Sequence, residues 1–192
     1  MPRVVKETRS RILDAAYTLF YRKGFGRVGV DEIACLAGIT KRTLYYHFNS
    51  KDELLAAVLE LQHGLAMARI RKHDDRYQGG AEEIITAVFS ELARWSKTPG
   101  WTGAGFTRLA MELADLPGHP AREVARRHKA EVEAWWADLL KKADVDLPHE
   151  RARDLMLLME GAMAMILFHS NQSYADTAAR AALQIISKTA LK

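Results

Sequence analysis

A short segment of the chain, residues 39–48, concentrates basic and aromatic side chains between apolar ones and reads ITKRTLYYHF. On a helix that turns by about 100° per residue, Leu44 and Phe48 share one side, while Arg42 and Tyr46 fall on the opposite side. We therefore expect a helix with a buried apolar face and an outward face of basic, hydroxyl and aromatic groups. Groups of these kinds bind the base edges and the phosphates of duplex DNA.

The outward residues divide by the DNA atoms that their side chains can reach. A guanidinium or an ammonium group can bond guanine O6 and N7, and a threonine can offer its hydroxyl or methyl group to a base edge. The predicted base readers, which come first on the helix, are Lys41, Arg42 and Thr43. The remaining residues are predicted to contact phosphates and fix the register on the duplex. They are Thr40, Tyr45, Tyr46, His47 and Lys51.

The neighbouring elements predict how this helix is held. A two-turn helix over residues 30–37 directs Ile33 inward and ends at Gly38, which suits a left-handed cap position. Thr40 then stands where an N-cap belongs, and the next helix extends to Phe48. Two short helices joined by a glycine-containing turn are typical of a helix-turn-helix, whose second helix enters the DNA major groove by its N-terminal end.

A capping-box pattern of Ser50 and Glu53 opens a long helix from Lys51 to about residue 72. Lys51 lies in the first turn of this helix, where its charge opposes the helix dipole. That placement is explained if the ammonium and the dipole both point at a DNA phosphate.

Charge is distributed unevenly along the chain. Residues 1–52 hold 10 Lys and Arg against 5 Asp and Glu, whereas residues 53–192 hold 18 against 19. A local positive field is what phosphate binding requires, so the basic excess indicates a nucleic-acid surface near the N-terminus. A solvated basic face without a partner would give the same count.

Helical signals recur along the whole chain, and strand signals are almost absent. Further helices are expected over residues 8–23, 81–97, 106–116, 120–142, 148–169 and 174–188. The sequence thus predicts an all-α fold of about nine helices. We expect a three-helix helix-turn-helix DNA-binding domain over residues 1–52 and a helical domain over residues 53–192.

Bulk properties limit the class of protein. The chain has 192 residues, of which 48% are apolar, so it can build a core. Its longest apolar tract, residues 155–168, is too short for a bilayer span and contains Glu160, and no signal peptide is evident. We expect a cytoplasmic protein without a membrane segment. The single cysteine, Cys35, cannot form an intrachain disulfide, and an inert core position is expected for it rather than a redox role.

The run ILDAAYTLFYRKGFGRVGVDEIACLAGITKRTLYYHFNSKDELLAAVL resembles the DNA-binding domain of the TetR family of bacterial transcriptional regulators. The resemblance covers about residues 8–59 and is strongest in LYYHFNSKDELL. It implies phosphate contacts at Tyr45, Tyr46, His47 and Lys51 and base contacts at the three base readers. Gly29 stands where the family usually has a capping Ser or Thr, so a hydroxyl contact to phosphate is missing there.

The same resemblance implies that residues 53–192 form a ligand-binding and dimerisation domain, and a second likeness, in the segment with HPAR, points to a sub-branch of the family. The last two helices would build the homodimer interface, and apolar residues on more than one face of the first of them fit that role. A dimer is also expected because one recognition helix reads only a half-site. A core helix without oligomer contacts is the alternative.

A small-molecule effector would bind in an apolar pocket between helices. The predicted lining, with Arg108 or Glu112 as a polar contact, is Trp101, Phe106, Arg108, Met111, Glu112, Trp135, Met159, Met163 and His169. These aromatic and methionine residues suggest an uncharged or amphipathic ligand, although plain core packing would use the same residue types.

Enzyme classes fit poorly. The seven histidines show no metal-ligand spacing, and the glycines of GWTGAGF lack the Lys and Ser/Thr of a phosphate-binding loop, so neither a metal site nor a cofactor is expected. The sequence favours a ligand-responsive, homodimeric transcriptional regulator, most simply a repressor that an effector releases from a palindromic DNA operator. Two alternatives remain, namely an effector-independent DNA-binding protein of chromosome organisation and an enzyme or carrier built on a helical bundle.

Overall fold

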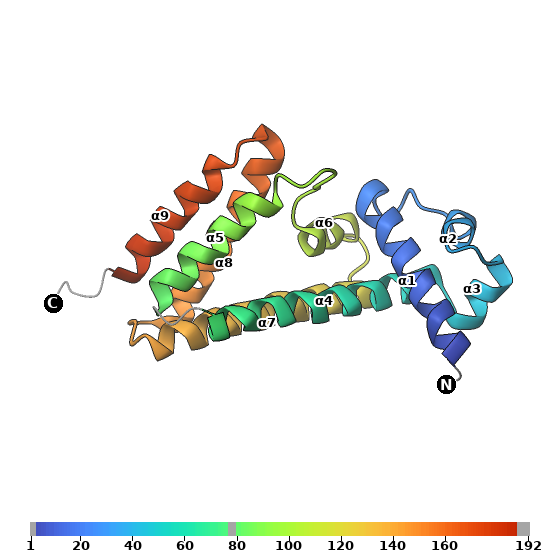
Figure 1. The fold of residues 1–192 in the computed structure, drawn as a ribbon, viewed down its shortest axis with the longest axis horizontal. Coiled ribbons are helices and arrows are strands. Elements are labelled where there is room, and N and C mark those ends of the chain that lie inside the picture. Colours follow the sequence, from blue (N-terminus) through green and yellow to red (C-terminus); the bar gives the residue numbers. More distant parts are fainter. Residues whose placement is uncertain (1–2, 77–79, 188–192) are drawn as a thin grey trace. The chain divides into compact units, whose positions relative to one another are not determined.

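The computed structural model describes residues 3–76 and 80–187, and all regular elements in these ranges are α-helices (Figure 1). They are α1 Arg3–Lys23, α2 Val30–Leu36, α3 Lys41–His47, α4 Lys51–Arg76, α5 Ala81–Trp95, α6 Gly105–Glu112, α7 Pro120–Lys142, α8 Pro148–His169 and α9 Ser173–Ser187. The all-α prediction is confirmed. Residue 188, the predicted end of the last helix, lies outside the described residues.

Local capping chemistry explains most of the helix boundaries. α1 ends before Gly24, whose φ of +86° is accessible to glycine at little cost. α7 and α8 begin at Pro120 and Pro148, as predicted, because proline fits the first turn of a helix. α6 is shorter than predicted, since it ends at Glu112 rather than at residue 116.

The described residues pack into two compact units. One is formed by the segments Met1–Ala66 and Gly105–His128, and the other by Met67–Ala104 and Lys129–Lys192. α4 and α7 each contribute residues to both units. These units are defined by packing. The functional division at residues 1–52 and 53–192 remains a prediction.

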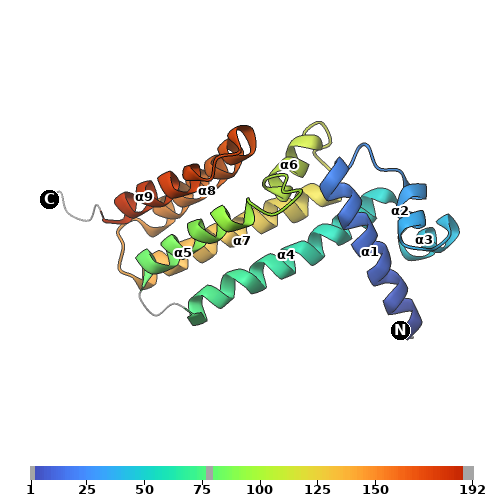
Figure 2. The same cartoon turned by 45° about the horizontal axis from the view of Figure 1, so that its top comes forward.

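The first unit is built around the three N-terminal helices. Ile12 of α1, Leu44 of α3 and Leu54 of α4 are fully buried in its core, and Leu109 of α6 packs in the same cluster. α1, α2 and α3 lie together in Figures 1 and 2, with α2 in contact with both of the others. α2 and α3 are only seven residues each, so this shared core, rather than helix length, stabilises them.

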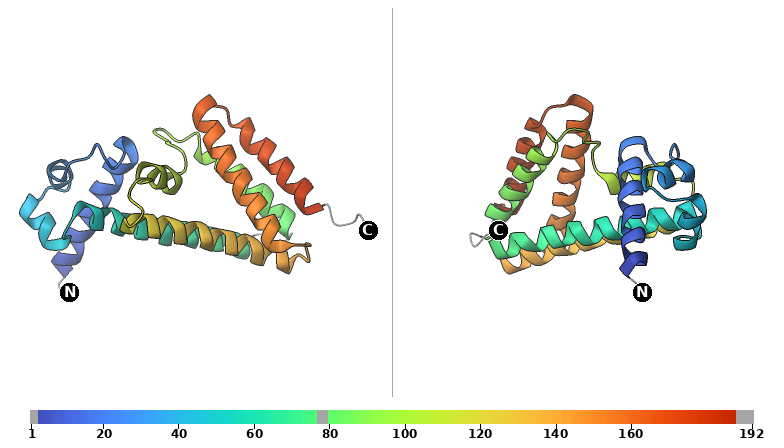
Figure 3. Two further views of the ribbon diagram at one scale, coloured as in Figure 1. Left: turned by 180° about the vertical axis from the view of Figure 1, so that it is seen from behind. Right: turned by 45° about the vertical axis from the view of Figure 1, so that its right-hand side comes forward.

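The second unit has its own core. Trp136 of α7, Leu155 of α8 and Phe89 of α5 are almost completely buried in it. α9 packs against both α8 and α5, and the three helices lie together in Figures 2 and 3. In the described ranges no helix is both long and apolar enough to span a membrane.

Candidate nucleic-acid interface

The geometry of α3 separates an anchoring side from an outward side. Leu44 and Phe48 are buried in the core of the first unit, whereas Arg42 is exposed and Tyr46 retains 80% of its accessible surface. Gly38 turns the chain between α2 and α3 with φ of +64°. The outward face predicted from the helical angles is therefore present.

Thr40 begins α3 as its N-cap, as predicted. Its Oγ1 accepts a hydrogen bond from the backbone N–H of Thr43 at 3.1 Å. The hydroxyl groups of Thr40 and Thr43 are also 2.9 Å apart and share a hydrogen bond. In the free chain, these two predicted DNA-contacting hydroxyls thus bind each other.

Lys41 is held by an acidic residue of the preceding helix. Its Nζ donates to Asp31 Oδ2 at 3.0 Å, across the turn that joins α2 and α3. That hydrogen bond, together with the negative charge of Asp31, raises the pKa of the Lys41 ammonium above its usual value. The ammonium is therefore fully charged at neutral pH.

Two aromatic neighbours follow on the same helix. Tyr45 is exposed, and the ring of Tyr46 meets the ring of His47 edge-on, with 5.4 Å between centroids. His47 is half-buried. The three side chains lie along one short helix and present hydroxyl and imidazole groups within one turn of each other.

Lys51 binds inside the unit. Its Nζ donates to the carbonyl oxygens of Phe25 at 2.9 Å and Val28 at 3.0 Å, and lies 4.1 Å from the centre of the Phe25 ring. Two of its three donors are therefore used to hold the α1–α2 loop, residues 24–29. The predicted phosphate contact can draw on the remaining N–H.

The capping box at the start of α4 forms, but one of its two hydrogen bonds has a different partner from the one predicted. Ser50 Oγ accepts from the Glu53 backbone N–H at 3.0 Å, as the pattern requires. The Glu53 carboxylate accepts from the backbone N–H of Asn49 at 2.8 Å instead of from the N-cap residue. At the start of α2, Gly29 caps with extended backbone and no side-chain bond, as expected for glycine.

Arg11 is a contributor to this surface that the sequence analysis missed. Its Nη2 donates to the carbonyl oxygens of Ala37 and, at 3.1 Å, Gly38, so α1 holds the turn before α3. The partners are 26 and 27 residues apart in sequence. Sequence patterns could not predict this contact, because helical periodicity and capping rules relate residues only a few positions apart.

The prediction of a core position for Cys35 is wrong. Cys35 is exposed on α2. Ile33 and Ala37 face the core, and with about 100° per residue Cys35 falls on the opposite side of the same helix.

The predicted effector-pocket residues are distributed over both units. In the first unit, the ring of Phe106 stacks on His128 with 3.8 Å between centroids, and Met111 is exposed. Arg108 donates to the carbonyl oxygens of Phe20 and Tyr21 at 3.0 and 2.7 Å. These carbonyls belong to the last turn of α1, and that of Phe20 also accepts a hydrogen bond from the backbone N–H of Gly24 at 2.9 Å.

Glu112 acts beside Arg108, one helical turn later on α6. Its carboxylate accepts hydrogen bonds from the backbone N–H groups of Phe25 at 3.1 Å and Gly26 at 2.6 Å. The α1–α2 loop is therefore held by Glu112 through its N–H groups and by Lys51 through its carbonyls. The structure gives Arg108 and Glu112 a role in joining α6 to the helix-turn-helix.

The remaining predicted pocket residues belong to the second unit. Met163 is buried, and Trp101, Trp135 and Met159 pack at the border of its core. His169, at the end of α8, is exposed and stacks on Tyr174. Their assignment to an effector pocket remains a prediction.

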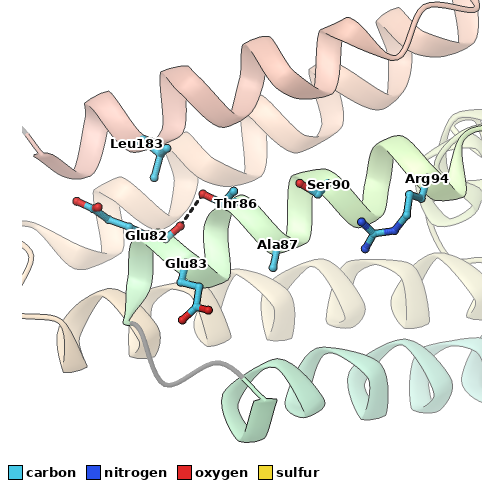
Figure 4. Close-up of a pocket in the computed structure, with 7 residues that line it drawn as sticks. All are labelled: Glu82, Glu83, Thr86, Ala87, Ser90, Arg94 and Leu183. Carbon is cyan, nitrogen blue, oxygen red and sulfur yellow. Dashed lines mark hydrogen bonds between the residues drawn. The ribbon is translucent and has the colours of Figure 1, made fainter.

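A separate open groove of about 560 Å³ runs along α5 (Figure 4). It is lined by Glu82, Glu83, Thr86, Ala87, Ser90, Arg94 and Leu183, none of which was predicted to bind an effector. Five of these seven residues are charged or carry a hydroxyl group, unlike the mainly aromatic and methionine lining expected from the sequence. In the described ranges, no group of three or more His, Cys, Asp or Glu residues is arranged to hold a metal ion.

Comparison with known proteins decides the family. A model described as bacterial regulatory proteins of the tetR family matches residues 12–58. The solved structure of a candidate TetR transcriptional regulator from Streptomyces avermitilis is 32% identical, covers 91% of this chain and 97% of its own, and gives a TM-score of 0.77. This chain belongs to the TetR family. The resemblance predicted from the sequence is confirmed.

Other TetR relatives agree. The biofilm operon negative transcriptional regulator IcaR of Staphylococcus epidermidis is 34% identical over 137 residues, which cover 70% of this chain and 68% of IcaR. The transcriptional regulator TtgR of Pseudomonas putida is 36% identical over 97 residues, 48% of this chain and 46% of TtgR. The matching part of the chain thus spans about half of the length of TtgR. A TetR-family regulator from Streptomyces coelicolor has the same fold, with a TM-score of 0.86 over 95% of both chains at 27% identity.

The segment matched by the TetR model contains the whole predicted DNA-contacting set, residues 40–51. The predicted pocket residues lie beyond it. The members of this family named above, IcaR and TtgR, are transcriptional regulators.

Proposed function

We propose that the chain is a ligand-responsive, sequence-specific transcriptional regulator that binds a palindromic DNA operator as a homodimer. The observation that carries this proposal is the division of α3 into two sides. Leu44 and Phe48 fix the helix on the core, and Arg42, Tyr45 and Tyr46 project into solvent. A solvated polar face would not need two tyrosines, whereas a surface that binds phosphates and bases uses them as rigid donors.

The roles of the individual residues follow from their position on α3. Lys41, Arg42 and Thr43 occupy the first turn, which enters the major groove in a helix-turn-helix, and we assign base contacts to them. Phosphate contacts are assigned to Thr40, Tyr45, Tyr46, His47 and Lys51. When these residues bind DNA, the hydrogen bond between the Thr40 and Thr43 hydroxyl groups must break, or DNA must bind the hydroxyl lone pairs that this bond does not use.

An apolar stripe on α8 supports the homodimer. Leu157, Gly161, Ala164 and Phe168 recur at helical spacing and are all exposed, Leu157 to 73% and Phe168 to 78%. Exposed apolar surface of this extent along one helix face marks a protein interface. The proposed occupant is the same face of a second copy, because a two-fold axis presents two α3 helices to the two half-sites of a palindrome. α9, which packs along α8, would complete the interface.

The α1–α2 loop offers a route from effector to DNA. α6 holds this loop through Glu112, and α4 holds it through Lys51. The loop leads directly into α2 and so into the helix-turn-helix. We infer that effector binding shifts α4 and α6, and that the loop transmits the shift to the spacing of the two α3 helices.

Repression is the proposed outcome of DNA binding, with release by the effector in the bacterial cytoplasm. IcaR, which matches over 137 residues, is a negative transcriptional regulator. For effective release, the effector must bind the DNA-free state more tightly by a few kcal/mol, since equal affinity for both states shifts no equilibrium.

The DNA-binding part of the proposal is tested by selection. The purified chain is incubated with a randomised duplex library at moderate ionic strength, and the bound duplexes are sequenced. Enrichment of an inverted repeat is the expected result. If the library remains random after several rounds, the proposed regulatory function is wrong. An enzyme or carrier built on a helical bundle would then be favoured.

The effector part needs a separate test. A thermal-shift screen of uncharged and amphipathic small molecules should yield a compound that raises the melting temperature and releases the selected duplex. If stabilising compounds leave DNA binding unchanged, or if none is found while DNA binding persists at many chromosomal sites, the effector-independent alternative holds.

A further inference from the structure

The two acidic residues at the start of α2 pair with cations from two different helices. Glu32 pairs with Lys23 at the end of α1, and Asp31 pairs with Lys41 at the start of α3. The Asp31–Lys41 pair is open to solvent, with 77% of the Asp31 side chain and 52% of the Lys41 side chain accessible. Exposed ion pairs contribute little to stability. We therefore expect this pair to matter for the position of the Lys41 ammonium rather than for folding stability.

We propose that Asp31 is a specificity-determining residue, which restrains Lys41 so that its ammonium serves base contacts and adds little to binding of random DNA. This inference rests on the proposed DNA-binding function of α3. It concerns a residue that the predicted DNA-contacting set does not include, and that belongs to the helix before the recognition helix.

The physical basis is the difference between the two modes of DNA binding. Random DNA is bound mainly through phosphate charge, and each neutralised phosphate steepens the salt dependence of affinity by about 0.9 in the logarithmic slope. A lysine on a flexible stem is well suited to any phosphate within reach. With Asp31 bound to it, Lys41 contributes almost no net charge to that attraction.

Base contacts are affected differently. An ammonium has three donors, and the hydrogen bond to Asp31 occupies one of them. The other two remain available for guanine O6 and N7, and the bond to Asp31 restricts the directions in which they point. Restricting the side chain before binding lowers the entropy cost of the specific contact. Asp31 thus weakens random binding more than operator binding.

The chain provides a matched control for this idea. Glu32 is the next residue on α2 and carries the same charge, but its partner Lys23 lies outside α3. Glu32→Gln removes one negative charge from the same turn of the same helix and leaves the Asp31–Lys41 pair in place. A general charge effect would make the two variants behave alike.

The experiment measures dissociation constants of the full chain for its selected duplex and for a random duplex of equal length over a series of KCl concentrations. Asp31→Asn should raise affinity for random DNA roughly fivefold at 0.15 M salt, with a slope steeper by about 0.9. Affinity for the selected duplex should change by less than about twofold, so the specificity ratio falls. Glu32→Gln should preserve that ratio.

A double-mutant cycle separates action through Lys41 from direct action. In a Lys41→Gln background, Asp31→Asn should raise affinity for random DNA no more than Glu32→Gln does, because only a general charge effect remains when there is no ammonium to release. Lys41→Gln alone should weaken the selected duplex without removing a phosphate contact from random DNA, so the salt slope on random DNA should not fall by the roughly 0.9 expected for such a contact. This variant tests the same idea without altering Asp31. Far-UV circular dichroism and melting temperature verify that each variant is folded.

Three results would overturn the inference. One is an equal rise of affinity on both duplexes in Asp31→Asn, and another is identical behaviour of Asp31→Asn and Glu32→Gln. The third is a loss on the selected duplex without a gain on random DNA, which would mean that the Asp31 carboxylate contacts a base itself. Failure of the wild-type chain to select any duplex would instead overturn the proposed function.

Discussion

At the scale of single residues, the predicted DNA-contacting side chains differ in what binds them in the free chain. Lys41 pairs with Asp31, Thr40 pairs with Thr43, and Lys51 binds two carbonyl groups of the α1–α2 loop. Each of these groups must exchange or share a partner when it contacts DNA. Arg42 is exposed at the start of α3, which makes it the residue best placed for direct reading of a base.

Arg42→Ala should relax the base preference at one position of each half-site. A bidentate contact from arginine to guanine contributes about 1–3 kcal/mol of discrimination, and alanine offers no donor. Competition with duplexes mutated at single positions measures the effect. Arg69→Ala, at an exposed position of α4, serves as the control and should preserve the full preference. Equal losses on selected and random DNA for Arg42→Ala would contradict a base-reading role.

Lys51→Met should lower both folding stability and DNA affinity. Methionine keeps an apolar stem over the Phe25 ring but donates nothing to the carbonyls of Phe25 and Val28, and the loss is expected to be about 1–2 kcal/mol. Affinity should fall on all duplexes, with the salt slope reduced by about 0.9 if a phosphate contact is lost. Urea unfolding and salt titrations measure these two effects.

The control for Lys51→Met is the same substitution at Lys72, an exposed residue later on α4. It should change neither quantity. A Lys51→Met protein with unaltered stability would show that the two carbonyl contacts are unimportant in solution. An unaltered salt dependence of DNA affinity would mean that Lys51 binds the loop carbonyls but does not contact a phosphate.

At the scale of elements, capping residues and proline positions predicted the boundaries of α2, α3, α7 and α8 closely, because these signals act within one turn of the helix. The contacts of Glu112 and Arg108 were not predictable in this way. Their partners are 86 to 88 residues away in sequence, and their residue types fit a ligand pocket equally well. Only the packing of α6 beside α1 shows that these charges bind backbone groups.

Glu112→Gln should loosen the α1–α2 loop without unfolding the chain. The two backbone N–H groups bind different carboxylate oxygens, and glutamine replaces one of these oxygens with an NH2 group that cannot accept a hydrogen bond. The loss of the negative charge also weakens the hydrogen bond that remains. Hydrogen exchange at the amides of Phe25 and Gly26 should become about tenfold faster, which corresponds to about 1.4 kcal/mol of local opening.

Asp115→Asn supplies the matched control, because Asp115 is an exposed carboxylate that follows α6 and lies outside the contacts that hold the α1–α2 loop. It should leave both exchange rates unchanged. If Glu112→Gln also left them unchanged, the carboxylate would not hold the loop, and the proposed route from α6 to the helix-turn-helix would lose its basis.

At the scale of the whole molecule, family membership accounts for the fold and for the regulatory class, and the proposed dimer depends on the exposed stripe of α8. The sequence predicted a dimer from the symmetry of operators and from apolar residues on several faces of α8. It could not say which of these residues remain exposed in a single chain. The structure identifies Leu157 and Phe168 as exposed, whereas Met163 and Ile166 are buried in their own unit.

Leu157→Glu combined with Phe168→Glu should convert the dimer into a folded monomer, because two like charges would be buried at the two-fold interface. Sedimentation velocity measures the assembly state, and far-UV circular dichroism verifies helix content. Leu116→Glu, at an exposed apolar position outside α8, should leave the dimer intact. A double variant that still sedimented as a dimer would place the interface elsewhere.

The central claim is that two copies of α3, related by symmetry, read the two halves of one duplex. It is tested most directly by titrating the purified chain with its selected duplex and with a duplex that keeps only one half-site, and by measuring affinity and the mass of each complex. The account predicts an even number of chains on the full site and binding weaker by roughly a hundredfold or more on the half-site. A single chain bound with equal affinity to both duplexes would contradict it.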